Sequence, residues 1–230
     1  GKGTSGKSTK LIHGGVRYLR QGNLSLVLES LKERALLKKN APHIVHDLKF
    51  VVPTYKWWES SFYGIGLKIY DWLAGKEGIG DSKILSKKET VHLLPTISEK
   101  DLRGGVLYYD AQFNDTRLLI NMMQTAKKEG ANVLNYHEFL SFTKTKDGTI
   151  DGGKINDTRN QKQYTVKAKA IVNATGVFSD SIRNMNKSTV SKIITSSQGV
   201  HIVLDKHFLP GNAAVMIPKT DDGRGLFAVP

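Results

Sequence analysis

Small residues, hydroxyls, a lysine, a histidine, two adjacent glycines and an arginine crowd into one run, residues 3–19. Residues 1–8 satisfy the G-x-x-x-x-G-K-[ST] pattern of a phosphate-binding loop, and the first six of them satisfy the G-x-G-x-x-G pattern of a dinucleotide-binding turn. Both patterns need a preceding strand and a following helix, whose N-terminal N–H groups hold the phosphate. Here no strand is visible before the run, and Gly14 and Gly15 stand where the helix should continue. The dinucleotide pattern also needs an acidic residue about 20 positions on. Glu29, the nearest candidate, lies inside a helical pattern, so neither short pattern is favoured.

The hydrophobic pattern predicts three helices that could position this run. The first covers residues 24–40, where apolar residues recur at helical spacing until Pro42 forbids continuation. Arg34 is interpreted as a cation on the surface of this helix. A short helix is predicted over 86–94, and a third begins with Asp115 as its N-cap. The buried face of the third helix is predicted to consist of Leu119, Met122, Met123 and Ala126.

Apolar and alternating stretches predict the strands between these helices. A turn at Asp147-Gly148 predicts a hairpin, and the almost wholly apolar residues 170–173 predict a strand buried on both faces. A helix–strand layer interrupted by strand-rich segments implies two interleaved domains. The predicted strands are residues 49–53, 105–109, 132–134, 139–145, 149–155, 164–169, 170–173, 199–204, 213–217 and 226–229.

Composition excludes several classes of function. The 230 residues contain no cysteine, which rules out disulfides and thiolate chemistry, and no apolar run is long enough to span a membrane. The formal charge of +13 suits an anionic partner, but the lysines are scattered and no nucleic-acid-binding motif is present, so no nucleic-acid partner is expected. His43 and His46 lack a third ligand at metal spacing and are interpreted as structural, so no metal site is expected.

The most unusual composition lies at residues 56–73, which hold all three tryptophans together with lysines. Amphipathic aromatic residues flanked by lysine suit a helix that lies on a membrane surface. A helix packed against the rest of the protein explains the same composition, and both interpretations stay open.

Thr4-Ser5 through Tyr18-Leu19 resembles the signature of the FAD-dependent glycerol-3-phosphate dehydrogenases, a family within the D-amino-acid-oxidase-like flavoproteins. The resemblance covers nearly the whole chain and is far more specific than either short pattern. Members of that family start with a strand and a true G-x-G-x-x-G turn before this run and continue beyond the position of Pro230, so an internal piece of a longer enzyme is expected. Four further stretches resemble the family in the same order, at residues 33–43, 109–118, 171–176 and 198–203.

The resemblance implies an α/β fold class (α+β overall), with an incomplete FAD-binding Rossmann-like domain interleaved with a strand-rich substrate domain. Residues 1–45 and 111–185 would belong to the FAD-binding domain, and residues 46–110 and 186–230 to the substrate domain. The implied reaction is oxidation of sn-glycerol 3-phosphate to dihydroxyacetone phosphate, with hydride passing from C2 to flavin N5 and electrons then passing to quinone. The protein would be cytoplasmic and peripheral on the inner face of the cytoplasmic membrane, with residues 56–73 as its membrane surface; a homodimer stays open.

The resemblance also implies roles for individual residues. Arg17 matches a substrate-contacting arginine, whose planar fork suits phosphate or alkoxide oxygens. His201 matches a histidine of the family, and a neutral imidazole could accept the proton of the C2 hydroxyl; Gln198 replaces the lysine usual in that stretch. A structural role for His201 stays equally open. The residues implied to contact FAD are Thr4, Ser5, Ser8, Thr9, Lys10, Leu11, Ile12, His13, Gly14, Ala174, Thr175 and Gly176.

Three other functions stay open at this stage. A glycerol-3-phosphate oxidase that reduces oxygen to peroxide is the nearest, since it would share the flavin and the substrate. A phosphate-loop NTPase and a basic binding module without catalysis belong to other classes of protein. We also expect the complete protein to purify yellow and residues 1–230 alone to be colourless.

Overall fold

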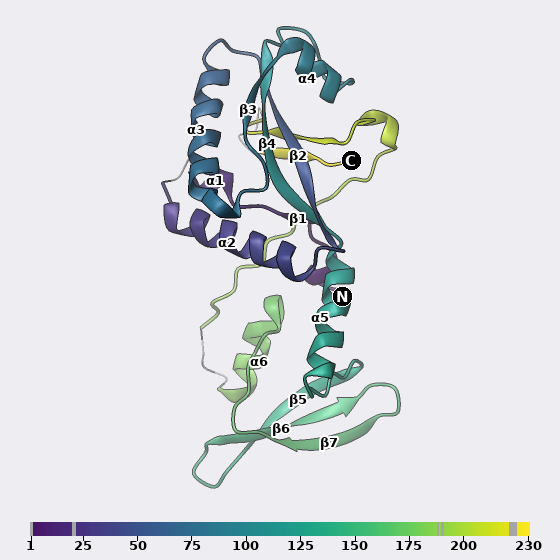
Figure 1. Ribbon diagram of the computed structural model, residues 1–230. Coiled ribbons are helices and arrows are strands. Elements are labelled where there is room, and N and C mark those ends of the chain that lie inside the picture. Colours follow the sequence, from purple (N-terminus) through teal and green to yellow (C-terminus); the bar gives the residue numbers. More distant parts are fainter. Residues whose placement is uncertain (1, 20–21, 188, 190, 221–224) are drawn as a thin grey trace. The chain divides into compact units, whose positions relative to one another are not determined.

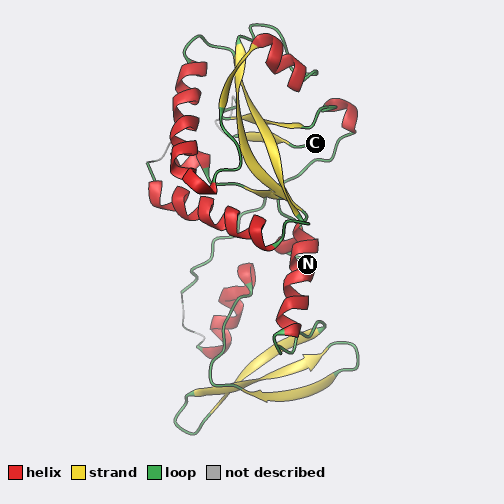
Figure 2. Ribbon diagram, viewed as in Figure 1, coloured by secondary structure: helices red, strands yellow, loops and turns green. Residues whose placement is uncertain are grey.

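The computed structural model describes residues 2–19, 22–187, 189, 191–220 and 225–230 (Figure 1). The chain forms two compact units. Unit 1 comprises Gly1–Gln124 and Ile202–Pro230, and unit 2 comprises Thr125–His201. Helices and strands are mixed in both units (Figure 2), in agreement with the predicted α/β class.

A six-stranded sheet forms the centre of unit 1. Its strands follow the order β1-β4-β2-β8-β9, with β3 also pairing with β4, and only the β2–β8 pair is parallel among the described strands. The ten residue pairs between β2 and β4 make the longest register, and the end of β4 pairs with β1, which belongs to residues 3–19, the signature run. The strands are β1 (Leu11–Ile12), β2 (Val45–Thr54), β3 (Lys83–Ser86), β4 (Gly104–Phe113), β8 (Ala213–Ile217) and β9 (Leu226–Ala228).

Helices pack on both faces of this sheet. Side chains alternate along each strand, so both faces carry apolar side chains for helices to cover. Phe50 and Tyr108 point to one face, where they pack with residues of α2 and α3, whereas Val51 and Leu107 point to the other face, beside the end of α4. Figure 1 shows α3 running along the strands and α2 crossing them near the lower end of α3. The helices are α1 (Val16–Leu19), α2 (Leu24–Asn40), α3 (Glu59–Ala74), α4 (Lys87–Leu93) and α5 (Asp115–Lys128), with 3-10 turns at Thr4–Gly6, Gly75–Glu77 and Lys206–Phe208.

Local sequence signals explain several helix ends. The Asn23 side chain accepts a hydrogen bond from the Leu26 N–H and caps α2, and Ser86 and Glu89 form a capping box at the start of α4. The prediction that Asp115 is the N-cap of α5 is wrong. The side chain of Asn114 accepts the Arg117 N–H instead, which frees the Asp115 carboxylate for contacts outside the helix.

Unit 2 contains a three-stranded antiparallel sheet in the order β5-β6-β7. The predicted hairpin at Asp147-Gly148 joins β5 to β6, and Gly148 adopts the positive φ of 85° that the turn requires. The elements of this unit are β5 (His137–Lys144), β6 (Ile150–Asp157), β7 (Lys162–Lys167), α6 (Ser179–Asn186) and the 3-10 turn Gly176–Phe178, together with the C-terminal end of α5.

Three predicted strands and one predicted helix face differ from the structure. Residues 132–134, 170–173 and 199–204 are not strands, and Val172 is 86% exposed. A strand needs a neighbour for its backbone hydrogen bonds, and no described strand pairs with these stretches. Likewise Met122 and Met123 of α5 are exposed, because no described element packs against that face.

Candidate functional site

The signature run forms an irregular loop against the edge of the unit 1 sheet. The Gly6 N–H donates to the Gly3 carbonyl, and the chain then enters the two-residue strand β1, which pairs with Ala111 and Gln112 of β4. Ser8 is therefore followed by a strand where a phosphate-binding loop would have a helix. This geometry disfavours the phosphate-loop interpretation. We call residues 8–14 the signature loop.

Asp115 holds the first end of the signature loop. Its Oδ2 accepts hydrogen bonds from the backbone N–H and the hydroxyl of Ser8, at 3.0 and 2.9 Å, and its Oδ1 accepts from the Lys10 ammonium at 2.8 Å. The Asp115 side chain is only 2% exposed. The hydrogen bond from Lys10, followed by those from Ser8, holds the pKa of Asp115 far below its usual range. This carboxylate therefore stays ionised at any ordinary pH.

Asp110 holds the other end of the signature loop. Its Oδ1 accepts from the Gly14 N–H at 3.0 Å, from Arg34 Nη1 at 2.6 Å and from the Tyr70 hydroxyl at 2.8 Å. Arg34, Tyr70 and Asp110 are all buried, and Arg34 Nη1 also donates to the Tyr109 carbonyl. Burial raises the pKa of Asp110, and the Arg34 guanidinium opposes that rise. Burial, and then the Asp110 charge, likewise raise the pKa of Tyr70.

The interpretation of Arg34 as a surface cation is wrong. Arg34 follows Val27 and Leu31 at helical spacing, so it shares the buried face of α2 and reaches Asp110 on β4. A buried guanidinium needs a partner of opposite charge, which Asp110 provides. The network of Arg34, Tyr70 and Asp110 was missed from the sequence, although the spacing of Arg34 on the apolar stripe was a signal that could have found it.

Close packing explains the glycine at position 14. A Cβ added to Gly14 would lie 2.1 Å from the Tyr70 hydroxyl oxygen and 2.4 Å from Leu31 Cδ2. Gly15 has a positive φ of 76°, which favours glycine. The pair lets the chain turn tightly from β1 into α1 over the Asp110 network.

A cavity of about 510 Å³ lies elsewhere in unit 1 along α3, whereas a smaller cavity of about 130 Å³ borders the signature loop. His13, Gly15 and Tyr18 line the smaller cavity from the side of the loop, and Tyr108 and Asp110 line it from β4. Burial raises the pKa of Tyr108, which stays a neutral phenol. The cavity thus brings the aromatic rings of Tyr18 and Tyr108 together with the polar side chains of His13 and Asp110.

The structure separates the predicted cofactor contacts into two groups. Ser8 and Lys10 are engaged by Asp115, whereas within the described chain the exposed hydroxyls of Thr4, Ser5 and Thr9 form no hydrogen bond. Leu11 and Ile12 form β1, exposed His13 lines the smaller cavity, and Gly14 is buried.

The remaining predicted site residues are not brought to this cavity by the described contacts. Arg17 belongs to α1, but its side chain lies outside the described residues. Ala174, Thr175 and Gly176 form an exposed turn in unit 2, in which the Thr175 N–H donates to the side chain of Asn173. His201 is exposed and lies in no helix or strand.

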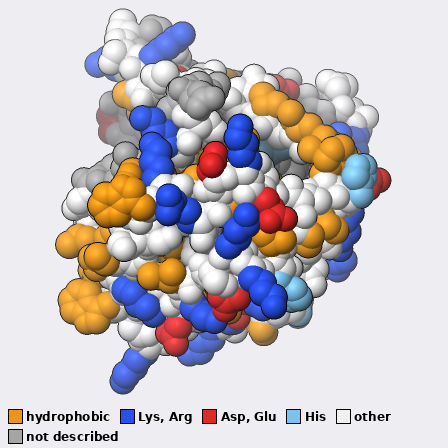
Figure 3. Space-filling view, turned by 90° about the horizontal axis from the view of Figure 1, so that it is seen from above, with side chains coloured by type: hydrophobic (Ala, Val, Ile, Leu, Met, Phe, Trp, Pro, Cys, Tyr) orange, Lys and Arg blue, Asp and Glu red, His pale blue; other side chains and the backbone are white. Residues whose placement is uncertain are grey.

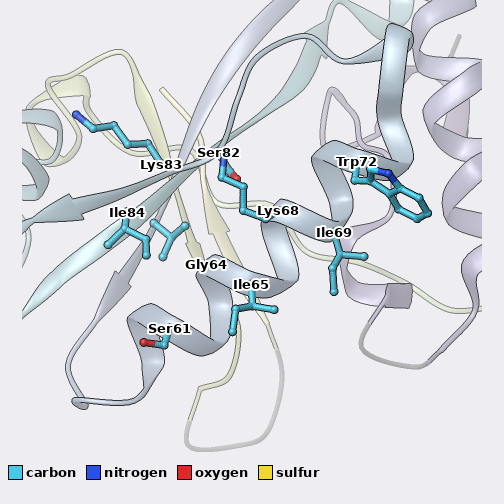
Figure 4. A pocket seen from close by; sticks show the side chains of 10 residues that line it. Ser61, Gly64, Ile65, Lys68, Ile69, Trp72, Ser82, Lys83 and Ile84 are labelled. Atoms are coloured by element: carbon cyan, nitrogen blue, oxygen red, sulfur yellow. The ribbon is translucent and has the colours of Figure 1, made fainter.

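The larger cavity is an open groove between α3 and β3 with an almost wholly apolar lining (Figure 4). Ile65, Ile69 and Trp72 line it from α3, and Ile84 lines it from β3. It contains no cluster of acid, base and nucleophile. Among the described residues no group of three His, Cys, Asp or Glu side chains could hold a metal ion.

Comparison with known proteins identifies relatives along the whole chain. The model of a family described as FAD dependent oxidoreductase matches residues 1–230. The chain is 39% identical to a mitochondrial glycerol-3-phosphate dehydrogenase of Schizosaccharomyces pombe and 43% identical to one of Arabidopsis thaliana, over 99% of its own length. It spans 37% and 38% of the length of those two proteins. Its fold is similar to that of the glycerol-3-phosphate dehydrogenase of Bacillus halodurans complexed with FAD, with a TM-score of 0.71 and 28% identity over 99% of this chain and 38% of that one.

Proposed function

Because this chain belongs to the FAD dependent oxidoreductase family, we propose that its protein oxidises sn-glycerol 3-phosphate to dihydroxyacetone phosphate with FAD as cofactor. The observation that carries this proposal is the identity of 39% and 43% to two glycerol-3-phosphate dehydrogenases over 99% of the chain. The signature loop and the cavity beside it supply the local support, since they combine turn-forming glycines, hydroxyls and aromatic walls.

The residues of the run fit an FAD molecule. Thr4, Ser5 and Thr9 offer exposed hydroxyls with no partner in the described chain, which suit the polar part of a dinucleotide. His13 and Gly15 border the smaller cavity, where we place the ring system of the flavin. Ser8 and Lys10 support this surface through Asp115 and so help to hold the FAD-contacting backbone.

The proposed reaction removes a hydride and a proton from the substrate, which leaves a ketone at C2. FAD, when bound, supplies a hydride acceptor at N5 of its ring. Arg17 holds the phosphate or the C2 oxygen of the substrate with its guanidinium fork. An imidazole nitrogen of His201 accepts the proton of the C2 hydroxyl.

The proposal also assigns the parts of the chain to an FAD-binding domain and a substrate domain. Residues 1–45 and 111–185 hold the cofactor, and Ala174, Thr175 and Gly176 form a second cofactor-facing turn among them. Residues 46–110 and 186–230 hold the substrate. The Ala174–Gly176 turn and the Thr4, Ser5 and Thr9 hydroxyls are exposed, so these groups are accessible to a ligand.

We further propose that α3 rests on an anionic membrane surface, at the inner face of the cytoplasmic membrane, where quinone accepts the electrons. Trp72 and Ile65, which line the apolar groove, are 78% and 65% exposed, and Trp57, two residues before α3, is 78% exposed. Leu67 and Tyr70 on the opposite face are buried, so α3 is both packed and amphipathic.

Lys68 and Lys83 line the groove together with these apolar side chains. Lys and Arg side chains are interspersed with hydrophobic ones on the face of the molecule in Figure 3. None of the described helices is long and apolar enough to cross a membrane. Sedimentation with anionic and neutral lipid vesicles tests the surface: Trp57→Ser/Trp72→Ser should reduce binding to anionic vesicles, whereas Phe208→Ser, which alters an exposed residue outside α3, should not.

The flavin spectrum of the complete gene product tests the proposed reaction. The purified protein should be yellow, and sn-glycerol 3-phosphate added without oxygen should bleach its visible flavin absorption, whereas glycerol should not. A colourless protein, or a flavin that the substrate fails to bleach, would reject the proposal. Oxygen uptake with a matching yield of peroxide would identify an oxidase instead of a dehydrogenase.

A further inference from the structure

The segment from Asp110 to Asp115 follows the signature loop in antiparallel fashion from one end to the other. Asp115 binds Ser8 and Lys10, Gln112 and Ala111 pair with β1, and Asp110 binds the Gly14 N–H. The Phe113 N–H adds a hydrogen bond to the Lys10 carbonyl at 3.0 Å. Both ends of the loop and the short strand between them therefore contact the same six residues, 110–115.

The loop needs such support, because little regular structure holds it. Among the described strands, the loop pairs only through the two-residue β1, and Lys10 adopts a positive φ of 57° that a lysine rarely adopts. The surrounding contacts must stabilise that conformation. The ion pair to Asp115 and the carbonyl contact to Phe113 hold Lys10 from both its side chain and its backbone.

We propose that residues 110–115 act as a clamp in which Asp115 and Asp110 position the signature loop for FAD, with Ser8 and Lys10 acting through Asp115. The inference rests on the proposed function and assigns positioning roles that differ from direct cofactor contact. Ser8 donates its hydroxyl to Asp115 and accepts the Lys10 N–H, so its oxygen has both a donor and an acceptor partner inside the loop.

A double-mutant cycle separates positioning from direct contact. The variants are Ser8→Ala, Asp115→Ala and their combination in the complete gene product, with Asp47→Asn as control, because Asp47 pairs with Lys38 at the surface. The dissociation constant of FAD is measured by flavin fluorescence, and hydrogen exchange of residues 8–14 is measured without FAD. Thermal unfolding of each apoprotein reports whether the fold survives.

Asp115→Ala should raise the dissociation constant of FAD by about tenfold, since it removes charge-assisted hydrogen bonds from the loop. It should also speed exchange at residues 8–14, with the exchange of β2 and β4 unchanged. Ser8→Ala should weaken FAD binding on its own and add nothing to Asp115→Ala. Asp47→Asn should leave both measurements at the wild-type value.

The clamp would be overturned if the double variant raised the dissociation constant of FAD by the product of the two single fold changes. Ser8 would then contact FAD independently of Asp115. Wild-type exchange at residues 8–14 in Asp115→Ala would overturn it as well. Lys10→Met, which removes an exposed ammonium, repeats the exchange test should Asp115→Ala fail to fold. Failure of the wild-type protein to bind FAD would reject the proposed function, whereas the exchange result would still decide the clamp.

Discussion

The two ends of the signature loop are held by carboxylates in very different surroundings. Asp110 lies in the core, where Arg34 and Tyr70 share its Oδ1 with the loop, and its burial raises its pKa. Asp115 begins α5 and is itself buried, but its partner Lys10 is half-exposed, and the hydrogen bond from Lys10 lowers the pKa of Asp115. The comparison indicates that the Asp110 end is part of the folded core, whereas the Asp115 end can be altered with the core intact.

The largest effect is expected from Arg34→Met. Without the guanidinium, the buried Asp110 carboxylate loses its counter-ion, and the free energy of unfolding should fall by about 3–5 kcal/mol. Urea denaturation of the complete gene product measures this loss. Lys38→Met, which removes an exposed pair with Asp47, is the control and should cost at most about 1 kcal/mol. Equal losses in the two variants would contradict the assignment of Asp110 to the core.

Gly14→Ala should have the next largest effect. The added methyl group would clash with the Tyr70 hydroxyl and with Leu31, so the free energy of unfolding should fall by about 1–3 kcal/mol. Gly3→Ala places the same group in open space and serves as the control. A Gly14→Ala protein as stable as the Gly3→Ala protein would show that the loop does not rest on the network as closely as described.

Tyr70→Phe removes one donor from Asp110 and should lower the free energy of unfolding by about 1 kcal/mol. Tyr55→Phe is a matched control, because the Tyr55 hydroxyl donates to the Ser98 carbonyl at an exposed site. Chemical denaturation of both variants measures the difference. No difference between them would mean that the buried hydroxyl contributes nothing to the Asp110 end.

The smallest effect is a difference in pH dependence. The pKa of Asp115 is lowered in the folded protein, so its stabilisation is present above the unfolded value of about 3.9 and is lost as the pH falls below it. The pKa of Asp110 is raised, so its titration favours the folded state below about 3.9, and that contribution is lost as the pH rises through the raised value.

Melting temperatures across the acidic range check these signs. The melting temperature of the wild type should exceed that of Asp115→Asn by less as the pH falls. The melting temperature of the wild type relative to that of Asp110→Asn should rise over the same range. If the difference in melting temperature from the wild type changed with pH in the same way for both variants, the two carboxylates would titrate alike.

Local patterns predicted several elements of both units. Helical spacing that ends before Pro42 predicted α2, the short helix predicted over residues 86–94 matches α4, and Asp147-Gly148 predicted the hairpin of unit 2. Each of these signals acts within a few residues of the chain, so it can be recognised without knowledge of the fold.

Long-range pairing was not predictable in the same way. Residues 170–173 have the composition of a buried strand but no described partner, so the stretch is exposed. The contacts of Asp110 and Asp115 with the signature loop join residues about 100 positions apart, as between Asp115 and Ser8 at a separation of 107. The resemblance of both stretches to one family indicated that they matter, but only the structure shows that they bind each other.

Hydrogen exchange with and without FAD tests the central claim, that the signature loop holds the cofactor, most directly. The complete gene product should gain protection at residues 8–14 when FAD binds, with little change in the hairpin of β5 and β6. Unchanged exchange at residues 8–14 in the presence of tightly bound FAD would contradict the account.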